Sequence, residues 1–174
     1  MEDFVIVSKD NEREFISKAK ELGWTSIVLL YKYEKGIKLK KFSEDFVKTG
    51  IYLDSDTKSD FSSFEIVVAL GTKFSSLPRG VTHVVMNEFE VEKDFIHQRR
   101  GGLNHVFLNE FKGKILFAFS ELQDNVKQDI ILGRMMQNLT ICNGDFVSLA
   151  DDANKMRFVG DVSALKRCLI KKKF

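Results

Sequence analysis

The sequence predicts a single α/β domain over residues 1–174, with mostly parallel strands wrapped into a shortened, distorted TIM-like β/α barrel. Short apolar runs alternate with amphipathic helical stretches along the whole chain, and the strands number about seven. A complete eightfold barrel usually needs about 200 to 250 residues, so this chain has room only for a trimmed version. A doubly wound open sheet is the alternative architecture.

The first part of the chain contains a strand, a helix and a second strand. Residues 4–7 form a short apolar run, and residues 25–31 (TSIVLLY) are continuously apolar, which is typical of a parallel strand buried on both faces. Between them, residues 11–22 have helical periodicity, with Asp10 as the expected N-cap and Gly23 as the expected residue after the helix. This order is a βαβ unit, whose two strands are parallel.

The middle of the chain is expected to be abbreviated. The gaps near residues 54–63 and 71–80 are short and rich in Ser, Asp, Thr and Gly, so each can hold a turn of helix but not a full crossover helix. The strand candidates around these gaps are residues 51–53, 64–70, 81–86 and, as a further short candidate, 94–96.

Helices and strands alternate again in the last part. We expect a helix that ends at Gly113, a strand over 115–119, the longest helix over 126–142 and a strand over 146–150. Asp161 is the expected cap of a final helix. The side chains expected to face the core from these helices are Leu103, Val106, Phe107, Phe111, Ile131, Met135, Leu139, Cys142, Leu165, Cys168 and Leu169.

The composition excludes several classes of protein. Hydrophobic residues make up 44% of the chain and charged residues 30%, which excludes a disordered chain. No apolar run approaches the length of about 18 residues that a membrane span needs. The acidic start at residues 1–3 lacks the basic start of a secretory signal, so we expect a cytoplasmic protein. Cys142 and Cys168 form no CxxC pair, which excludes a zinc ribbon and a disulfide framework and predicts inert core thiols.

The charge is distributed unevenly along the chain. A net charge of +2 does not by itself indicate a nucleic-acid-binding protein. Lysines gather in residues 32–48, arginines at 99–100 and further basic residues at 166–173, whereas acidic residues collect in 88–94. Each cluster taken alone is typical of a solvated face.

The sequence lacks the common catalytic motifs. It contains no GxSxG, GxxxxGK[ST] or GxGxxG. Its three histidines, His83, His97 and His105, have no HxH or HxxxH spacing, so we assign no metal ligand and no catalytic residue. His83 lies inside a strand candidate, where a core or rim position is expected.

One segment, residues 94–106, stands above this background. A strand candidate ends, two arginines follow, Gly101-Gly102 allows a turn, and an amphipathic helix begins. In a parallel α/β domain this connection lies at the carboxyl end of a strand, where ligands bind, and a helix start there favours a phosphate. The expected phosphate-contacting residues are His97, Arg99, Arg100, Asn104 and His105.

Two further positions complete the set of candidate contacts. Arg134 and Asn138 are one helical turn apart, and we expect them to project from the side opposite the apolar stripe of the longest helix. Arg157 follows the strand at 146–150, which would place it near the same end of a barrel as Arg99.

These segments resemble ribonuclease P protein component 3, an archaeal and eukaryotic family whose barrel is related to the polymerase-and-histidinol-phosphatase (PHP) type. The resemblance lies in DFIHQRRGGLNHV at 94–106, ILFAFS at 115–120, ILGRMMQNLTIC at 131–142 and Met156-Arg157 followed by Gly160-Asp161. Related metal-dependent phosphoesterases carry HxH near the first strand. Residues 4–7 contain no histidine there, so inherited metal catalysis is not expected.

The resemblance implies a non-catalytic subunit of a ribonucleoprotein endonuclease. In that family the RNA removes the 5′ leader of precursor tRNA with bound Mg²⁺, and the protein supports the ribonuclease P RNA together with a second, smaller protein subunit. The chain would then bind no cofactor of its own, would be inactive in isolation, and would contact RNA through the residues named above. The alternative is a small metal-dependent PHP-type phosphoesterase that uses His97, His105 and scattered aspartates.

Overall fold

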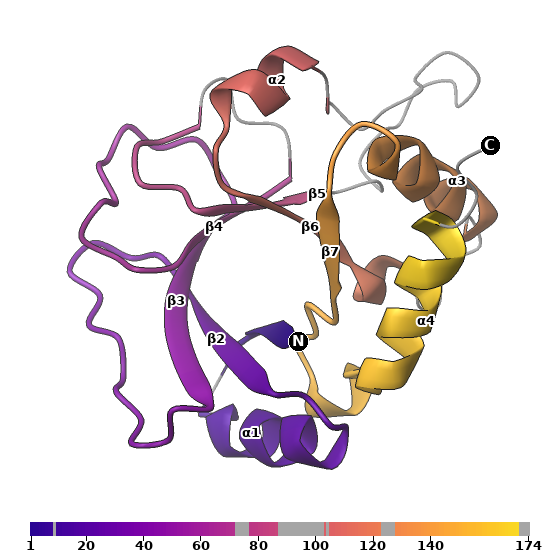
Figure 1. Cartoon of the computed structure of the whole chain (residues 1–174). Coiled ribbons are helices and arrows are strands. Elements are labelled where there is room, and N and C mark those ends of the chain that lie inside the picture. Colours follow the sequence, from indigo (N-terminus) through magenta and orange to yellow (C-terminus); the bar gives the residue numbers. More distant parts are fainter. Residues whose placement is uncertain (9, 72–76, 87–102, 104, 123–127, 171–174) are drawn as a thin grey trace.

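The parallel strands follow one another around a barrel-shaped sheet (Figure 1). The structure, a computed structural model, describes residues 1–8, 10–71, 77–86, 103, 105–122 and 128–170. The strands are β1 (Glu2–Ile6), β2 (Ser26–Lys32), β3 (Val47–Leu53), β4 (Val67–Leu70), β5 (His83–Met86), β6 (Lys114–Ala118) and β7 (Gly144–Val147). The helices are α1 (Glu12–Glu21), α2 (His105–Glu110), α3 (Gln128–Leu139) and α4 (Val159–Ile170), with 3₁₀ turns η1 (Phe119–Leu122) and η2 (Ala153–Lys155).

The sheet comes close to closing on itself. All seven strands are parallel and lie in sequence order. After β7, Ala150 forms a parallel bridge with Val5, and the Ile6 amide donates to the Ala150 carbonyl at 2.9 Å. This contact joins β1 to the segment that follows β7 and nearly closes the sheet, so the predicted trimmed TIM-like barrel is confirmed and the open-sheet alternative is wrong.

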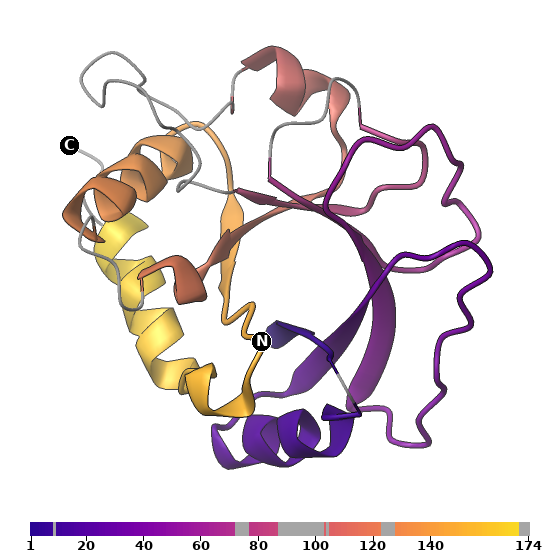
Figure 2. The same cartoon turned by 180° about the vertical axis from the view of Figure 1, so that it is seen from behind.

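The outer surface of the barrel is covered unequally. Helices α1, α3 and α4 cover one side, whereas long connections without helices cover β3 and β4 on the other (Figures 1 and 2). In the described residues of these connections, apolar side chains take the place of a helix: Phe61 is fully buried, and Tyr33 packs edge-on against it at 4.8 Å between ring centroids. The prediction of an abbreviated middle is therefore confirmed for the gap at 54–63, whereas residues 72–76 of the gap at 71–80 lie outside the described residues.

Alternation along the strands builds two apolar layers. One layer fills the barrel interior with Phe4, Val28, Val68, Leu116 and their neighbours. The other lies between the strands and the helices, where Val5, Ile27 and Leu29 meet residues of α1, α3 and α4. Strands buried on both faces need continuous apolar runs, which is why TSIVLLY and ILFAF are recognisable in the sequence.

Some details of the predicted elements are wrong. The residue before α1 is Asn11, not Asp10, because the Asp10 backbone has φ of +59° and its carboxylate accepts instead from Lys40. Helix α4 begins at Val159, so Asp161 lies in its first turn and does not precede it. Cys168 is exposed because it lies on the outer side of α4, and Cys142 is half-buried. Gly23 has the expected positive φ, +79°.

The start of β3 also differs from the sequence prediction, and one strand candidate cannot be compared. β3 begins at Val47, four positions before the expected start, because Lys48, Thr49 and Gly50 interrupt the apolar pattern without interrupting the pairing with β2. The strand candidate at 94–96 lies outside the described residues. Within the described part of the chain, the structure has no helix with the length and apolar character of a membrane span.

Candidate functional site

The segment predicted to bind phosphate, residues 94–106, falls largely outside the described residues. His97, Arg99, Arg100 and Asn104 all belong to the part that the structure does not describe, and so do Gly101 and Gly102. His105 is described only as the first residue of α2.

Arg134 and Asn138 do not lie on the surface as predicted. Arg134 retains only 5% of its accessible surface and Asn138 none, so neither presents a side chain for an external ligand. The reason is helical geometry: positions 131, 134, 135 and 138 follow the i, i+3, i+4, i+7 spacing and share the face of α3 that is turned toward the barrel. This spacing is visible in the sequence and could have predicted that both side chains are buried.

Arg157 is the exposed member of the predicted set among the side chains that the structure describes. Its guanidinium carbon lies 5.8 Å from the centre of the Phe119 ring, at the end of β6. Its backbone is held on both sides, because its amide donates to Ser148 Oγ at 3.2 Å and its carbonyl accepts from Trp24 Nε1 at 2.8 Å. The side chain therefore projects from a fixed position beside β6 and β7.

The seam between β1 and β7 contains a carboxylate that the sequence analysis did not identify. Asp3 is fully buried, and its Oδ1 accepts from the Ser148 amide at 2.6 Å and from the Phe4 amide at 2.9 Å. Its Oδ2 is buried and has no hydrogen-bond partner. Burial raises the pKa of Asp3 to about 6, although the hydrogen bonds from Ser148 and Phe4 act in the opposite direction.

The amino-terminal end of the barrel interior carries a polar layer. His83 is buried there as expected, with its ring 5.0 Å from that of Phe4 and its Nδ1 2.8 Å from Thr82 Oγ1. Its Nε2 is buried and has no hydrogen-bond partner. Burial lowers the pKa of His83 to about 4, and the positive charge of the neighbouring Lys114 acts in the same direction. The imidazole is therefore neutral at pH 7.

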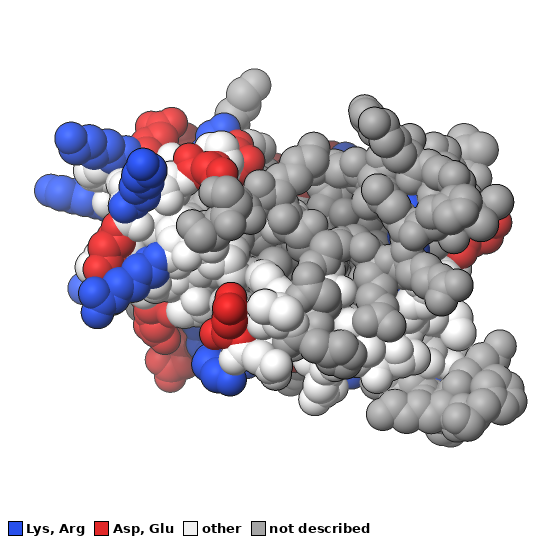
Figure 3. Space-filling model, turned by 90° about the horizontal axis from the view of Figure 1, so that it is seen from above, with Lys and Arg blue, Asp and Glu red and all other residues white. Residues whose placement is uncertain are grey.

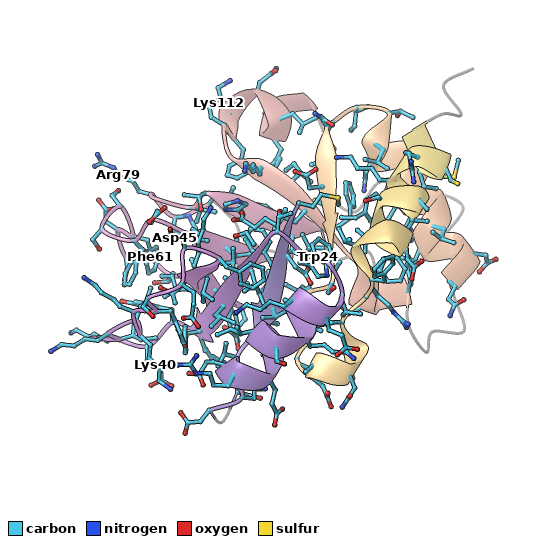
Figure 4. The ribbon with its side chains drawn as sticks, turned by 60° about the horizontal axis from the view of Figure 1, so that its bottom comes forward. Trp24, Lys40, Asp45, Phe61, Arg79 and Lys112 are labelled. Carbon is cyan, nitrogen blue, oxygen red and sulfur yellow. The ribbon has the colours of Figure 1, made fainter. Side chains whose placement is uncertain are left out.

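The connection between β2 and β3 is attached to the start of α1 by an ion-pair cluster. Lys40 Nζ lies 2.6 Å from Glu12 Oε1 and 2.8 Å from Asp10 Oδ1, and Tyr31 donates its hydroxyl to Glu12 at 3.1 Å. Burial acts to raise the pKa of Glu12, but the hydrogen bonds from Lys40 and Tyr31 outweigh it and lower the pKa. Lys40 lies on the loop-covered side of the barrel (Figure 4).

The described residues include exposed cations that could contact an anionic ligand. Within the described residues, no group of three or more His, Cys, Asp and Glu side chains is arranged to hold a metal ion. Exposed cations lie beside β6 and β7, where Arg157 projects, and on the connection between β2 and β3, which carries several lysines. Such groups can bind phosphate oxygens.

Comparison with protein-family models, curated proteins and solved structures finds no match.

Proposed function

We propose that this chain is a non-catalytic protein subunit of a ribonuclease P-type ribonucleoprotein. Its role would be to support an RNA that removes the 5′ leader of precursor tRNA. Its partners would be that RNA and a second, smaller protein subunit, and the catalytic Mg²⁺ would be held by the RNA.

The observation that carries this proposal is the packing of the segments that resemble the family. The segments 115–120, 131–142 and Met156-Arg157, which include most of β6, most of α3 and the turn before α4, are separated in sequence but meet on one side of the barrel. Phe117, Met135 and Met156 belong to one apolar core, and Arg157 lies over Phe119. The segments that resemble the family thus pack together in one part of the barrel. This packing supports the proposal that the chain and the family share a fold.

The buried members of the pattern have a different role under this proposal from the one first expected. Arg134 and Asn138 would position α3 on the barrel and would not touch RNA. Arg157, whose backbone is held by Ser148 and Trp24, would remain a phosphate contact. Arg99 and Arg100 remain predicted contacts from the sequence.

Co-purification tests the proposal directly. The tagged full chain is isolated from its native cells, and the bound RNA is sequenced after washes at low and high salt. We expect a tRNA-processing RNA to be enriched over a tag-only control and to be released as salt rises. Recovery of the chain with no enriched RNA at low salt would overturn the proposal.

A further inference from the structure

The connection between β2 and β3 presents exposed lysines that no described acid neutralises. Lys35, Lys38 and Lys41, here called the lysine ridge, are exposed and form no ion pair with a described residue. They lie within residues 33–46, which cover the barrel where a crossover helix would otherwise lie. Viewed from above, Lys and Arg side chains project from the end of the molecule that these connections form (Figure 3).

The backbone beneath the ridge is anchored. Ile37 and Leu39 alternate with the lysines and pack toward the core of β3 and β4, and Phe42 packs against the main core. The Arg13 guanidinium carbon lies 6.0 Å from the centre of the Phe42 ring. A ligand that binds the lysines would therefore not have to order this segment, which lowers the entropic cost of binding.

Several acids near the ridge are already engaged by other cations. Lys40 holds Asp10 and Glu12, and Arg13 pairs with Glu44 at 3.2 Å. The exposed acids Glu34 and Asp45 remain at the two ends of the segment. Neither of these two acids forms an ion pair with a lysine of the ridge.

The neighbouring connections carry charges of both signs. Lys58 is exposed on the connection between β3 and β4, and Arg79 on the one between β4 and β5 lies 3.7 Å from the carboxylate of Asp60. These two connections are joined because the Phe61 amide donates to the Arg79 carbonyl at 2.9 Å. Figure 4 shows Arg79 and Phe61 on the loop-covered side and Lys112 well away from Lys40.

The chemistry of this surface fits RNA better than a protein partner. Stable protein interfaces have an apolar centre and are depleted in lysine. The large apolar side chains that are exposed in the described residues are Met1, Val106 and Phe158, and none lies on this connection. Exposed lysines on a supported backbone instead suit phosphates, and structured RNA is recognised mainly through its shape and backbone.

We propose that the lysine ridge binds the phosphate backbone of a structured RNA. This inference rests on the proposed function and names the surface that carries it out. The contact is electrostatic and independent of RNA sequence, and it lies on the loop-covered side of the barrel rather than beside Arg157.

The test compares two variants with the same change in charge. The ridge variant is Lys35→Ala/Lys38→Ala/Lys41→Ala, and the control is Lys112→Ala/Lys114→Ala/Arg167→Ala, which removes exposed cations elsewhere. Binding of a fluorescently labelled precursor tRNA transcript is followed by anisotropy over a range of KCl concentrations. We expect the slope of log affinity against log salt to fall by about 2 to 3 in the ridge variant and by less than about 1 in the control. Near 0.1 M salt, the ridge variant should bind roughly tenfold or more weakly than wild type.

The outcomes separate this inference from the proposed function. Both variants must first show the circular dichroism and tryptophan fluorescence of the wild type. If the ridge variant keeps the wild-type slope, or loses a protein partner while keeping its RNA, the inference is wrong. If a tRNA-processing RNA co-purifies from cells equally with wild type and ridge variant, the proposed function stands and the ridge inference falls. If it co-purifies with neither, the proposed function falls, and the inference built on it falls as well.

Discussion

Two buried ionisable side chains, Asp3 and His83, make the stability of this barrel depend on pH in opposite ways. Asp3 is held at the seam by two backbone amides, and burial raises its pKa to about 6. His83 is enclosed in the barrel interior, and burial lowers its pKa to about 4. Both titrate in the same window, so their effects largely cancel in the wild type.

Replacing Asp3 should remove its own contribution to the pH dependence of stability and leave the opposite contribution of His83. The folded state binds a proton at Asp3 more tightly than the unfolded state, so this residue increases the free energy of unfolding as pH falls from about 6 to about 4. Asp3→Asn removes that gain, which we expect to be about 2–3 kcal/mol. Urea unfolding followed by fluorescence of Trp24 between pH 4 and 7 measures the difference. Parallel profiles for variant and wild type would show that the carboxylate is not perturbed.

Replacing His83 has the opposite effect. The unfolded histidine takes up a proton near pH 6.5, whereas the buried one does so near pH 4, so His83 lowers the free energy of unfolding as pH falls between these values. His83→Asn, whose side-chain amide can also form a hydrogen bond with Thr82, should remove this loss and leave the gain from Asp3. The variant should therefore become more stable relative to wild type with each step from pH 6.5 to 4. A relative stability that falls over this range contradicts the assignment.

Among the connecting segments, Gly80 couples two loops that replace helices. It has φ of +91°, and a Cβ built on it would lie 2.5 Å from the backbone of Phe61 and Ser62. Gly36 has a similar φ, +85°, but no atom within 4 Å of the same position. An alanine at Gly36 would add backbone strain alone, whereas an alanine at Gly80 would add both backbone strain and steric overlap.

The two alanine substitutions should differ in cost. Gly36→Ala should cost about 1–2 kcal/mol in the free energy of unfolding, because an L-residue is strained at positive φ. Gly80→Ala adds overlap with backbone atoms and should cost about 1–3 kcal/mol more. Urea unfolding of both variants at pH 7 measures the costs. Equal costs would mean that the connection near Gly80 can move away without penalty.

At the scale of the whole molecule, the proposed function predicts that the isolated chain has no nuclease activity. If the RNA performs the cleavage, the isolated chain should not cut precursor tRNA in the presence of Mg²⁺, and product should stay at the level of a no-protein reaction. The assay uses the full chain after two different purification steps, which removes contaminating nucleases. Cleavage that elutes with the chain through both steps would refute the subunit proposal and favour the phosphoesterase alternative.

Some of the sites could be derived from the sequence and others could not. The faces of α3 follow from spacing alone, so the burial of Arg134 and Asn138 was predictable from positions 131 and 135. The contact between Asp3 and Ser148 was not, because the two residues are 145 positions apart and meet only where the barrel closes. The cluster of Glu12, Tyr31 and Lys40 likewise depends on how residues 33–46 lie against α1.

The sequence by itself determined that this chain is a single α/β domain of parallel strands with a shortened middle. The tertiary structure decided that the sheet curves into a barrel and does not stay open. Continuous apolar strands must be buried on both faces, and connections too short for a crossover helix leave part of the sheet covered by loops. Only the tertiary structure decided which charges meet. Closure between Val5 and Ala150 buries Asp3, and docking of residues 33–46 engages Lys40 while Lys35, Lys38 and Lys41 remain exposed. Side-chain environments depend on packing between distant segments, whereas strand and helix periodicity is a local property of the chain.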